Sequence, residues 1–202
     1  MVYSVPASDL DALQSYCREE LTGVPVERRS LSLSARREML GRLGEAAAFA
    51  LIRHHLPNVM LTNANEARGN QPGYDLLANG KHRIQVKGRC WVELIDFSAA
   101  PLSSRVSWNN DLWIMVDFGP LVDGRHGRLF GNDDVRPRGQ IDYYVAPTSD
   151  LRDLVARKFG ARFEGRVKLW AGKTDAYRRN RHHTKELFQY RNAVHHLNSL
   201  ES

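Results

Sequence analysis

Residues 73–87 read Gly73-Tyr74-Asp75-Leu76-Leu77-Ala78-Asn79-Gly80-Lys81-His82-Arg83-Ile84-Gln85-Val86-Lys87. The pattern predicts two short strands joined by a tight turn, because Asn-Gly between two strand-like runs is a strong hairpin signal. Side chains alternate across a strand, so Gln85 and Lys87 share one face, while Ile84 and Val86 share the apolar face. With Asp75 on the first strand, the polar face would carry a carboxylate, an amide and an ammonium group. Such a set can hold a divalent cation and act on a phosphodiester.

The geometry of the turn decides whether Asp75 joins this set. A two-residue Asn-Gly turn would pair Asp75 with Ile84 and point the carboxylate away from the face of Gln85 and Lys87. A three-residue loop of residues 78–80, with Gly80 left-handed, would instead pair Asp75 with Arg83. The three polar side chains then lie on one face. We predict the three-residue loop.

The remaining chain carries the signals of a mixed α/β fold in a single domain. Apolar residues at helical spacing with capping and terminating residues predict helices, and apolar runs bounded by turn residues predict strands. The nearly continuous apolar run of residues 112–118 suits a central strand that is covered on both faces. In chain order we expect helices at 8–21 and 34–55, a strand at 58–62, the two strands of 73–87, a strand at 112–118, a hairpin excursion or loop at 119–140, a strand at 141–146, a helix through Phe159 capped by Thr148 or Ser149, and a final helix at 184–200.

Composition limits the classes of protein to which this chain can belong. Its 202 residues suffice for one domain with a sizeable core. The two cysteines, Cys17 and Cys90, cannot form a disulfide framework and have no zinc-type spacing, so we expect a reducing, cytoplasmic setting. No apolar run is long enough to span a bilayer, and the N-terminus does not resemble a signal peptide.

The charge of the chain is uneven. The formal net charge is +6, and residues 151–202 carry 12 Lys and Arg against 5 Asp and Glu. The first 150 residues are nearly neutral, so the basic excess is C-terminal. A basic surface favours polyanions such as nucleic acid, although many basic proteins bind none.

Three segments, taken in order, resemble the PD-(D/E)XK nuclease superfamily of restriction endonucleases, Holliday-junction resolvase-like enzymes and repair nucleases. They are Leu43-Gly44-Glu45-Ala46-Ala47-Ala48-Phe49 on the predicted helix, Gly73-Tyr74-Asp75 on the first hairpin strand, and Ile84-Gln85-Val86-Lys87 on the second. The resemblance covers residues 34–118 and implies a restriction-endonuclease-like core, with a central mixed sheet flanked by helices. It divides the chain into an N-terminal helical extension (1–33), a nuclease core (34–159) and a basic C-terminal helical segment of the same domain (160–202).

The resemblance also implies roles for individual residues. Asp75 would bind Mg²⁺ directly, the side chain of Gln85 would be a second ligand, and the main-chain carbonyl of Val86 would complete the set, with Mn²⁺ able to substitute. Lys87 would orient or activate the attacking water and offset negative charge in the transition state. Glu45 would reach the site from the helix. As the only charged residue in the segment 43–52, Glu45 needs a polar partner or a metal, because an unpaired buried carboxylate is costly.

Gln85 departs from the family pattern, which usually has Asp or Glu at this position. An amide oxygen can still coordinate Mg²⁺, but the site loses one negative charge. An inactive DNA-binding relative is therefore an open alternative, and Asp75 with Lys87 is also compatible with an ordinary surface ion pair.

Residues around the motif and in the basic C-terminal segment are candidates for nucleic-acid contacts. Arginine and amide side chains contact phosphates and base edges, although solvated polar surface is an equally simple interpretation. The candidates are Arg68, Asn70, Gln71, Tyr74, Arg89, Arg178, Arg179, Arg181 and Lys185. The adjacent histidine pairs are not expected to chelate metal, because neighbouring side chains on a helix diverge by about 100°.

These observations predict a Mg²⁺-dependent DNA endonuclease that leaves 5′-phosphate and 3′-hydroxyl ends, as the family commonly does. Its context would be restriction and defence, or junction and repair processing, with the protein associated with the nucleoid if bacterial. Cutting both strands with one active site each would require a homodimer. The alternatives are a non-catalytic DNA-binding module with this fold, a protein whose basic face binds an acidic partner, and a nuclease that acts on RNA.

Overall fold

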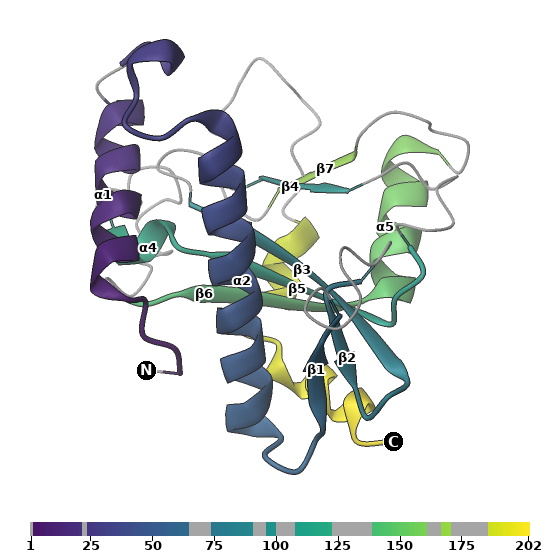
Figure 1. Ribbon diagram of the computed structural model, residues 1–202. Coiled ribbons are helices and arrows are strands. Elements are labelled where there is room, and N and C mark those ends of the chain that lie inside the picture. Colours follow the sequence, from purple (N-terminus) through teal and green to yellow (C-terminus); the bar gives the residue numbers. More distant parts are fainter. Residues whose placement is uncertain are drawn as a thin grey trace.

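A five-stranded mixed sheet lies at the centre of the computed structural model, with helices on both of its faces (Figure 1). In spatial order the strands are β1 (Leu61–Asn63), β2 (Leu76–Ala78), β3 (His82–Arg89), β5 (Leu112–Asp117) and β6 (Asp142–Pro147). Neighbouring strands are antiparallel except for β3 and β5, which are parallel. The structure describes residues 2–21, 24–64, 74–90, 96–99, 108–122, 139–160, 167–170 and 186–202. The predicted α/β class and its three-stranded meander are confirmed.

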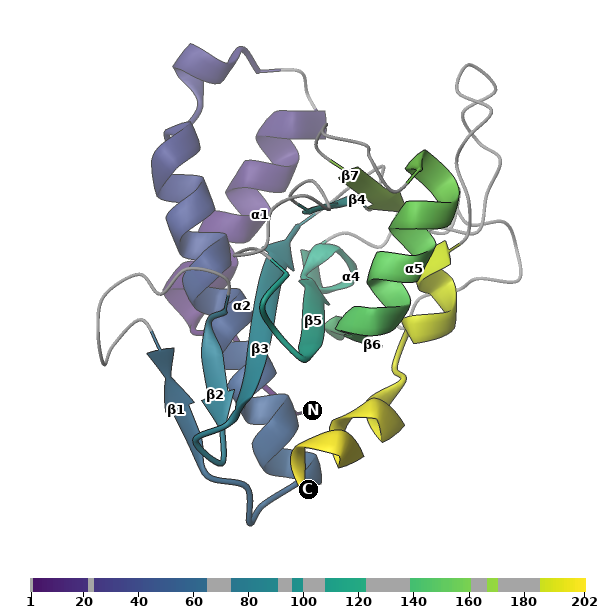
Figure 2. The same cartoon turned by 90° about the vertical axis from the view of Figure 1, so that its right-hand side faces the viewer.

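Two hydrophobic cores lie on opposite faces of the sheet. Helices α1 (Ala7–Leu21) and α2 (Leu33–His55) cover one face, and α5 (Thr148–Phe159) covers the other, as Figure 2 shows. Strand β5 contributes Leu112, Ile114 and Val116 to the first core and Trp113 and Met115 to the second. Because every residue of β5 is buried, the prediction of a central strand covered on both faces is confirmed.

Helix α2 begins close to its predicted position and approaches the sheet at two glycines. The hydroxyl oxygen of Ser32 accepts a hydrogen bond from Ala35 N at 3.1 Å and so caps the helix. A Cβ built on Gly44 would lie 3.0 Å from the Cα atom of Gly88 in β3, and one built on Gly88 would lie 2.0 Å from the carbonyl oxygen of Leu40. The backbones of α2 and β3 therefore touch directly, which is possible only where both residues lack a side chain.

Helix α1 packs beside α2, and its Cys17 contacts Cys90, the residue that directly follows β3. Cys17 and Cys90 are buried and form no disulfide, and their sulfur atoms lie at hydrogen-bonding distance, 3.0 Å apart. None of the helices in the described ranges has the length and apolar composition that a membrane span requires.

The C-terminal segment differs from the single helix predicted over 184–200. It forms two 3₁₀ helices, η3 (Glu186–Tyr190) and η4 (Val194–Leu200). Asn192 separates them with a φ of 53°, and its N–H donates to Tyr143 O at 2.7 Å. Leu187 and Tyr190 belong to one core, whereas Leu197 and Leu200 belong to the other. The chain thus crosses the edge of β6, and hydrogen bonding to that edge interrupts the helix.

Three further predictions need correction. Strand β1 spans Leu61–Asn63 rather than 58–62. The N-cap of α5 is Pro147, not Thr148 or Ser149, because the hydroxyl of Thr148 donates to the Asn110 side chain instead. The segment 119–140, predicted as a hairpin excursion or loop, begins with a short helix, α4 (Gly119–Val122), whose first N–H donates to the side chain of Asp117 at 2.9 Å. A second antiparallel pair, β4 (Asp96–Ala99) with β7 (Val167–Trp170), was not predicted.

Candidate active site

The hairpin between β2 and β3 has a three-residue loop, but its residues differ from the predicted ones. Ala78 pairs with His82, so residues 79–81 form the loop, and Lys81 N donates to Ala78 O at 3.1 Å. Gly80 is left-handed as predicted, with φ 71°, and Asn79 is left-handed as well, with φ 51°. The side chain of Asn79 binds two other segments of the chain. Its Oδ1 atom accepts a hydrogen bond from Met60 N at 2.9 Å, and its Nδ2 atom donates to Leu200 O at 2.9 Å.

Asp75 directly precedes β2, and it is not paired with Arg83 as predicted, because Arg83 pairs with Leu77. The N–H of Asp75 donates to the carbonyl oxygen of Ile84 at 2.8 Å, although Ile84 is already paired with Leu76. Asp75 contacts Gln85 through its side chain, whose Oδ2 atom accepts a hydrogen bond from Gln85 Nε2.

The ladder between the two strands opens at Asp75. The last main-chain bond runs from Asp75 N to Ile84 O at 2.8 Å. The next donor on β3, Val86 N, binds the Oδ2 atom of Asp75 at 2.7 Å in place of a main-chain carbonyl. Because N–H groups of a strand point along the sheet, this carboxylate lies near the plane of the sheet.

Three oxygen-bearing groups converge at this opening. The Nε2 atom of Gln85 donates to Asp75 Oδ2 and lies 3.3 Å from the carbonyl oxygen of Val86. A rotation of the amide by 180° would exchange Nε2 for Oε1 without moving the rest of the side chain. The Asp75 carboxylate, the Gln85 amide and the Val86 carbonyl, predicted as metal ligands, are therefore next to one another.

Lys87 lies on the same face as Gln85. Its Nζ atom is 6.0 Å from the centre of the Trp113 ring, which belongs to the second core. Burial lowers the pKa of Lys87 below its ordinary value. The Asp75 carboxylate opposes this shift, Arg89 adds to it, and Glu45 opposes it more weakly. The ammonium group is thus poorly solvated and close enough to both carboxylates to feel their charge.

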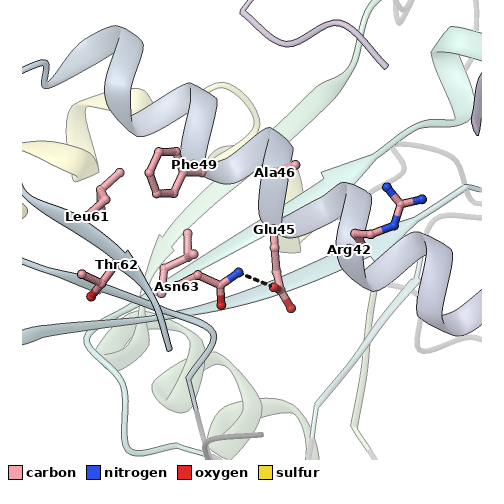
Figure 3. A pocket seen from close by; sticks show the side chains of 8 residues that line it. Arg42, Glu45, Ala46, Phe49, Leu61, Thr62 and Asn63 are labelled. Carbon is pink, nitrogen blue, oxygen red and sulfur yellow. Dashed lines mark hydrogen bonds between the residues drawn. The ribbon is translucent and has the colours of Figure 1, made fainter. Parts of the chain in front are cut away.

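Glu45 extends from α2 toward the end of β1. Its Oε2 atom accepts a hydrogen bond from Asn63 Nδ2 at 3.1 Å, as Figure 3 shows. The neighbouring Gly44 is the point at which α2 touches β3, so the helix holds Glu45 close to the strands. Glu45 has a polar partner, as expected for a partly buried carboxylate.

These residues fit a hard divalent cation. Mg²⁺ takes oxygen ligands and usually binds through one or two carboxylates with several waters, and here the donors are a carboxylate, an amide oxygen and a carbonyl, with Glu45 nearby. In the part of the chain that the structure describes, no three His, Cys, Asp or Glu side chains form a metal-binding group. A cation here would therefore depend on the neutral donors Gln85 and Val86.

The predicted nucleic-acid contacts are placed only in part. Tyr74 lies under the guanidinium of Arg83, with 5.4 Å between the Arg83 Cζ atom and the ring centre. Arg89 donates to Gly88 O at 2.9 Å, and its charge lowers the pKa of Lys87. The other candidates lie outside the described residues: Arg68, Asn70, Gln71, Arg178, Arg179, Arg181 and Lys185.

Sequence reasoning missed Asn63, Arg83 and the glycine contact between α2 and β3. Asn63 lies at the predicted boundary between a strand and a polar loop, where a partner for Glu45 could have been sought. Gly88 directly follows Lys87 inside a strand, and an interior strand glycine is a known sign of close backbone approach.

No protein family model, curated protein or solved structure that was compared with the chain matches it.

Proposed function

We propose that this protein is a Mg²⁺-dependent DNA endonuclease with a restriction-endonuclease-like core of the PD-(D/E)XK type. The order of its elements supports the proposal: helix α2, the meander β1–β3, the buried strand β5, strand β6 and helix α5. The observation that carries the proposal is the opened ladder, where Asp75 Oδ2 accepts from Val86 N and from the Gln85 amide, beside Lys87.

Each residue has a physical role in this proposal. Asp75, Gln85 and Val86 would hold Mg²⁺ through oxygen atoms, and Glu45 would add a second negative charge from α2. When bound, Mg²⁺ would stabilise charge on the phosphoryl oxygens and make water a stronger nucleophile. Lys87 would place a compact positive charge against the phosphate. Because burial lowers its pKa, Lys87 exchanges a proton nearer to neutral pH than an exposed lysine does.

The test is cleavage of supercoiled plasmid, a branched junction and single-stranded DNA in Mg²⁺, Mn²⁺ or EDTA. Asp75→Asn and Lys87→Met should each abolish metal-dependent cleavage. The controls are Asp153→Asn and Lys81→Met, which remove the same charges from exposed positions on α5 and in the hairpin loop. Cleavage that persists in EDTA, or that survives both site substitutions, would reject the proposed site.

One observation favours a second candidate, a DNA-binding protein with this fold and no catalysis. The Gln85 amide donates to Asp75 and so satisfies the carboxylate without any cation. Such a protein would bind DNA with an affinity that falls steeply with salt. It would cut no substrate in either metal, and Asp75→Asn would leave its affinity unchanged.

A further inference from the structure

A pocket of about 740 Å³ opens beside the candidate site, between α2 and the strands β1 and β2. Figure 3 shows side chains of α2 on one side of it and side chains of β1 on the other. Glu45 is the one residue of the candidate site that also lines this pocket. The lining residues are Arg42, Glu45, Ala46, Phe49, Leu61, Thr62, Asn63 and Leu76.

The pocket follows from the way α2 is seated on the sheet. The helix packs mainly on β3 and β5, where the glycine contact draws the backbones together. Strands β1 and β2 lie beyond that contact, at the edge of the sheet. The side chains of Leu61 and Leu76, which are buried, and of Phe49, which is half-buried, then line a recess that the helix does not fill.

The lining is apolar around Phe49 and Leu61 at one end and polar around Asn63 and Glu45, as Figure 3 shows. Phe49, Leu61 and Leu76 offer an aromatic ring and two aliphatic side chains. Asn63 supplies an amide at the polar end, where it donates to Glu45. Arg42 adds a guanidinium group that is 59% exposed and lies 2.7 Å from Asp9. A flat aromatic ligand with hydrogen-bonding edges matches this arrangement, and the volume lies within the range of small-ligand sites.

The geometry points to an unpaired nucleobase as the occupant, held next to the phosphodiester that the candidate site receives. This inference rests on the proposed function and specifies its substrate class. A base that is paired in a duplex cannot enter a side pocket unless it leaves the stack. The preferred substrates are therefore nucleic acids with an unpaired nucleotide, such as single strands, flaps and bulges. Phe49 would contact the face of the base, and Asn63 its polar edge.

The test measures binding in EDTA, so that it does not depend on cleavage. The probes are a single-stranded oligonucleotide containing 2-aminopurine, the same strand in a perfect duplex, and a duplex with 2-aminopurine as a one-nucleotide bulge. Binding should quench 2-aminopurine in the single strand and the bulge. Phe49→Leu keeps an apolar side chain and should weaken binding of both by about tenfold or more, while affinity for the perfect duplex stays unchanged.

Two further variants show that the effect belongs to the aromatic ring. Phe49→Tyr should retain the binding of the parent protein. Met60→Ala, which removes a side chain that is 68% exposed and does not line the pocket, should have no effect. Thermal unfolding of each variant identifies any loss of folding, which Phe49→Tyr is least prone to cause.

The outcomes separate this inference from the proposed nuclease. The nucleobase pocket would be overturned if Phe49→Leu and the parent protein bound the bulged duplex with equal affinity, even if metal-dependent cleavage is found. It would also be overturned if the probe bound without quenching. Failure of every probe to bind would overturn it too. Quenching that depends on Phe49, in a protein that cuts no DNA with any metal, would keep the pocket and reject the nuclease.

Discussion

Gly88→Ala tests the contact that holds α2, and with it Glu45, against the sheet. The added Cβ would lie 2.0 Å from the carbonyl oxygen of Leu40, whereas real Cβ contacts stay beyond 3.0 Å. The carbonyl would have to retreat by at least the difference, 1.0 Å. Because the clashing atom is a main-chain oxygen of α2, no flexible side chain can absorb this movement.

The expected loss of stability is large. Overpacking of a core typically costs about 1–3 kcal/mol, and a clash with helix backbone belongs at or above the upper end. A loss of about 3 kcal/mol corresponds to a Tm lower by about 6–12 °C in a chain of this size. The displaced helix would also carry Glu45 away from Asp75 and Lys87, so any cleavage activity should fall with it.

Gly41→Ala is the matched control, because it adds the same methyl group to the same helix where no atom lies within 4 Å. Alanine is favoured over glycine inside a helix by about 1 kcal/mol, so this variant should be slightly more stable than the parent. Circular dichroism during thermal and urea unfolding measures both. A Tm of Gly88→Ala within about 2 °C of the parent would refute the close contact, given the shift expected per kcal/mol.

Three other substitutions test the site and its hairpin. Gln85→Glu replaces the amide that donates to Asp75 with a second carboxylate, so it should lower the free energy of unfolding in EDTA by about 2 kcal/mol. Its Tm should rise more on addition of Mg²⁺ than the Tm of the parent protein. An equal rise in the two proteins would contradict the metal site. Burial lowers the pKa of Lys87, so between that pKa and 10.5 the unfolded chain binds more protons than the folded one, and the free energy of unfolding rises with pH. Lys87→Met should remove this slope and be more stable than the parent protein at pH 7, as measured by urea titrations. Parallel curves of stability against pH for the two proteins would contradict the burial of the charge. Gly80→Ala places a side chain at φ 71° in the hairpin loop and should lower stability by about 1 kcal/mol in the same titrations; an unchanged midpoint would argue against the left-handed turn.

Local periodicity was enough to predict most of the elements and the side chains that share a face of β3. The alternation of Ile84, Gln85, Val86 and Lys87 determined which side chains share a face, because the pleat of a strand is a property of neighbouring residues. The apolar run at β5 likewise identified a strand covered on both faces, which its complete burial confirms.

Contacts between distant parts of the chain decided the rest. The hairpin register depends on Asn79, whose side chain binds Met60 and Leu200, and no local pattern encodes those partners. The single C-terminal helix predicted from the sequence does not form, because the N–H of Asn192 donates to Tyr143 O in β6. The position of α2 on the sheet depends on two glycines, Gly44 and Gly88, that come into contact only once the chain is folded. The sequence by itself therefore determined which side chains share a face of β3. Only the tertiary structure decided that the Asp75 carboxylate binds the main chain of β3, that Glu45 bonds to Asn63, and that a pocket lies between α2 and the strands β1 and β2, because each of these depends on backbones from separate elements packing together.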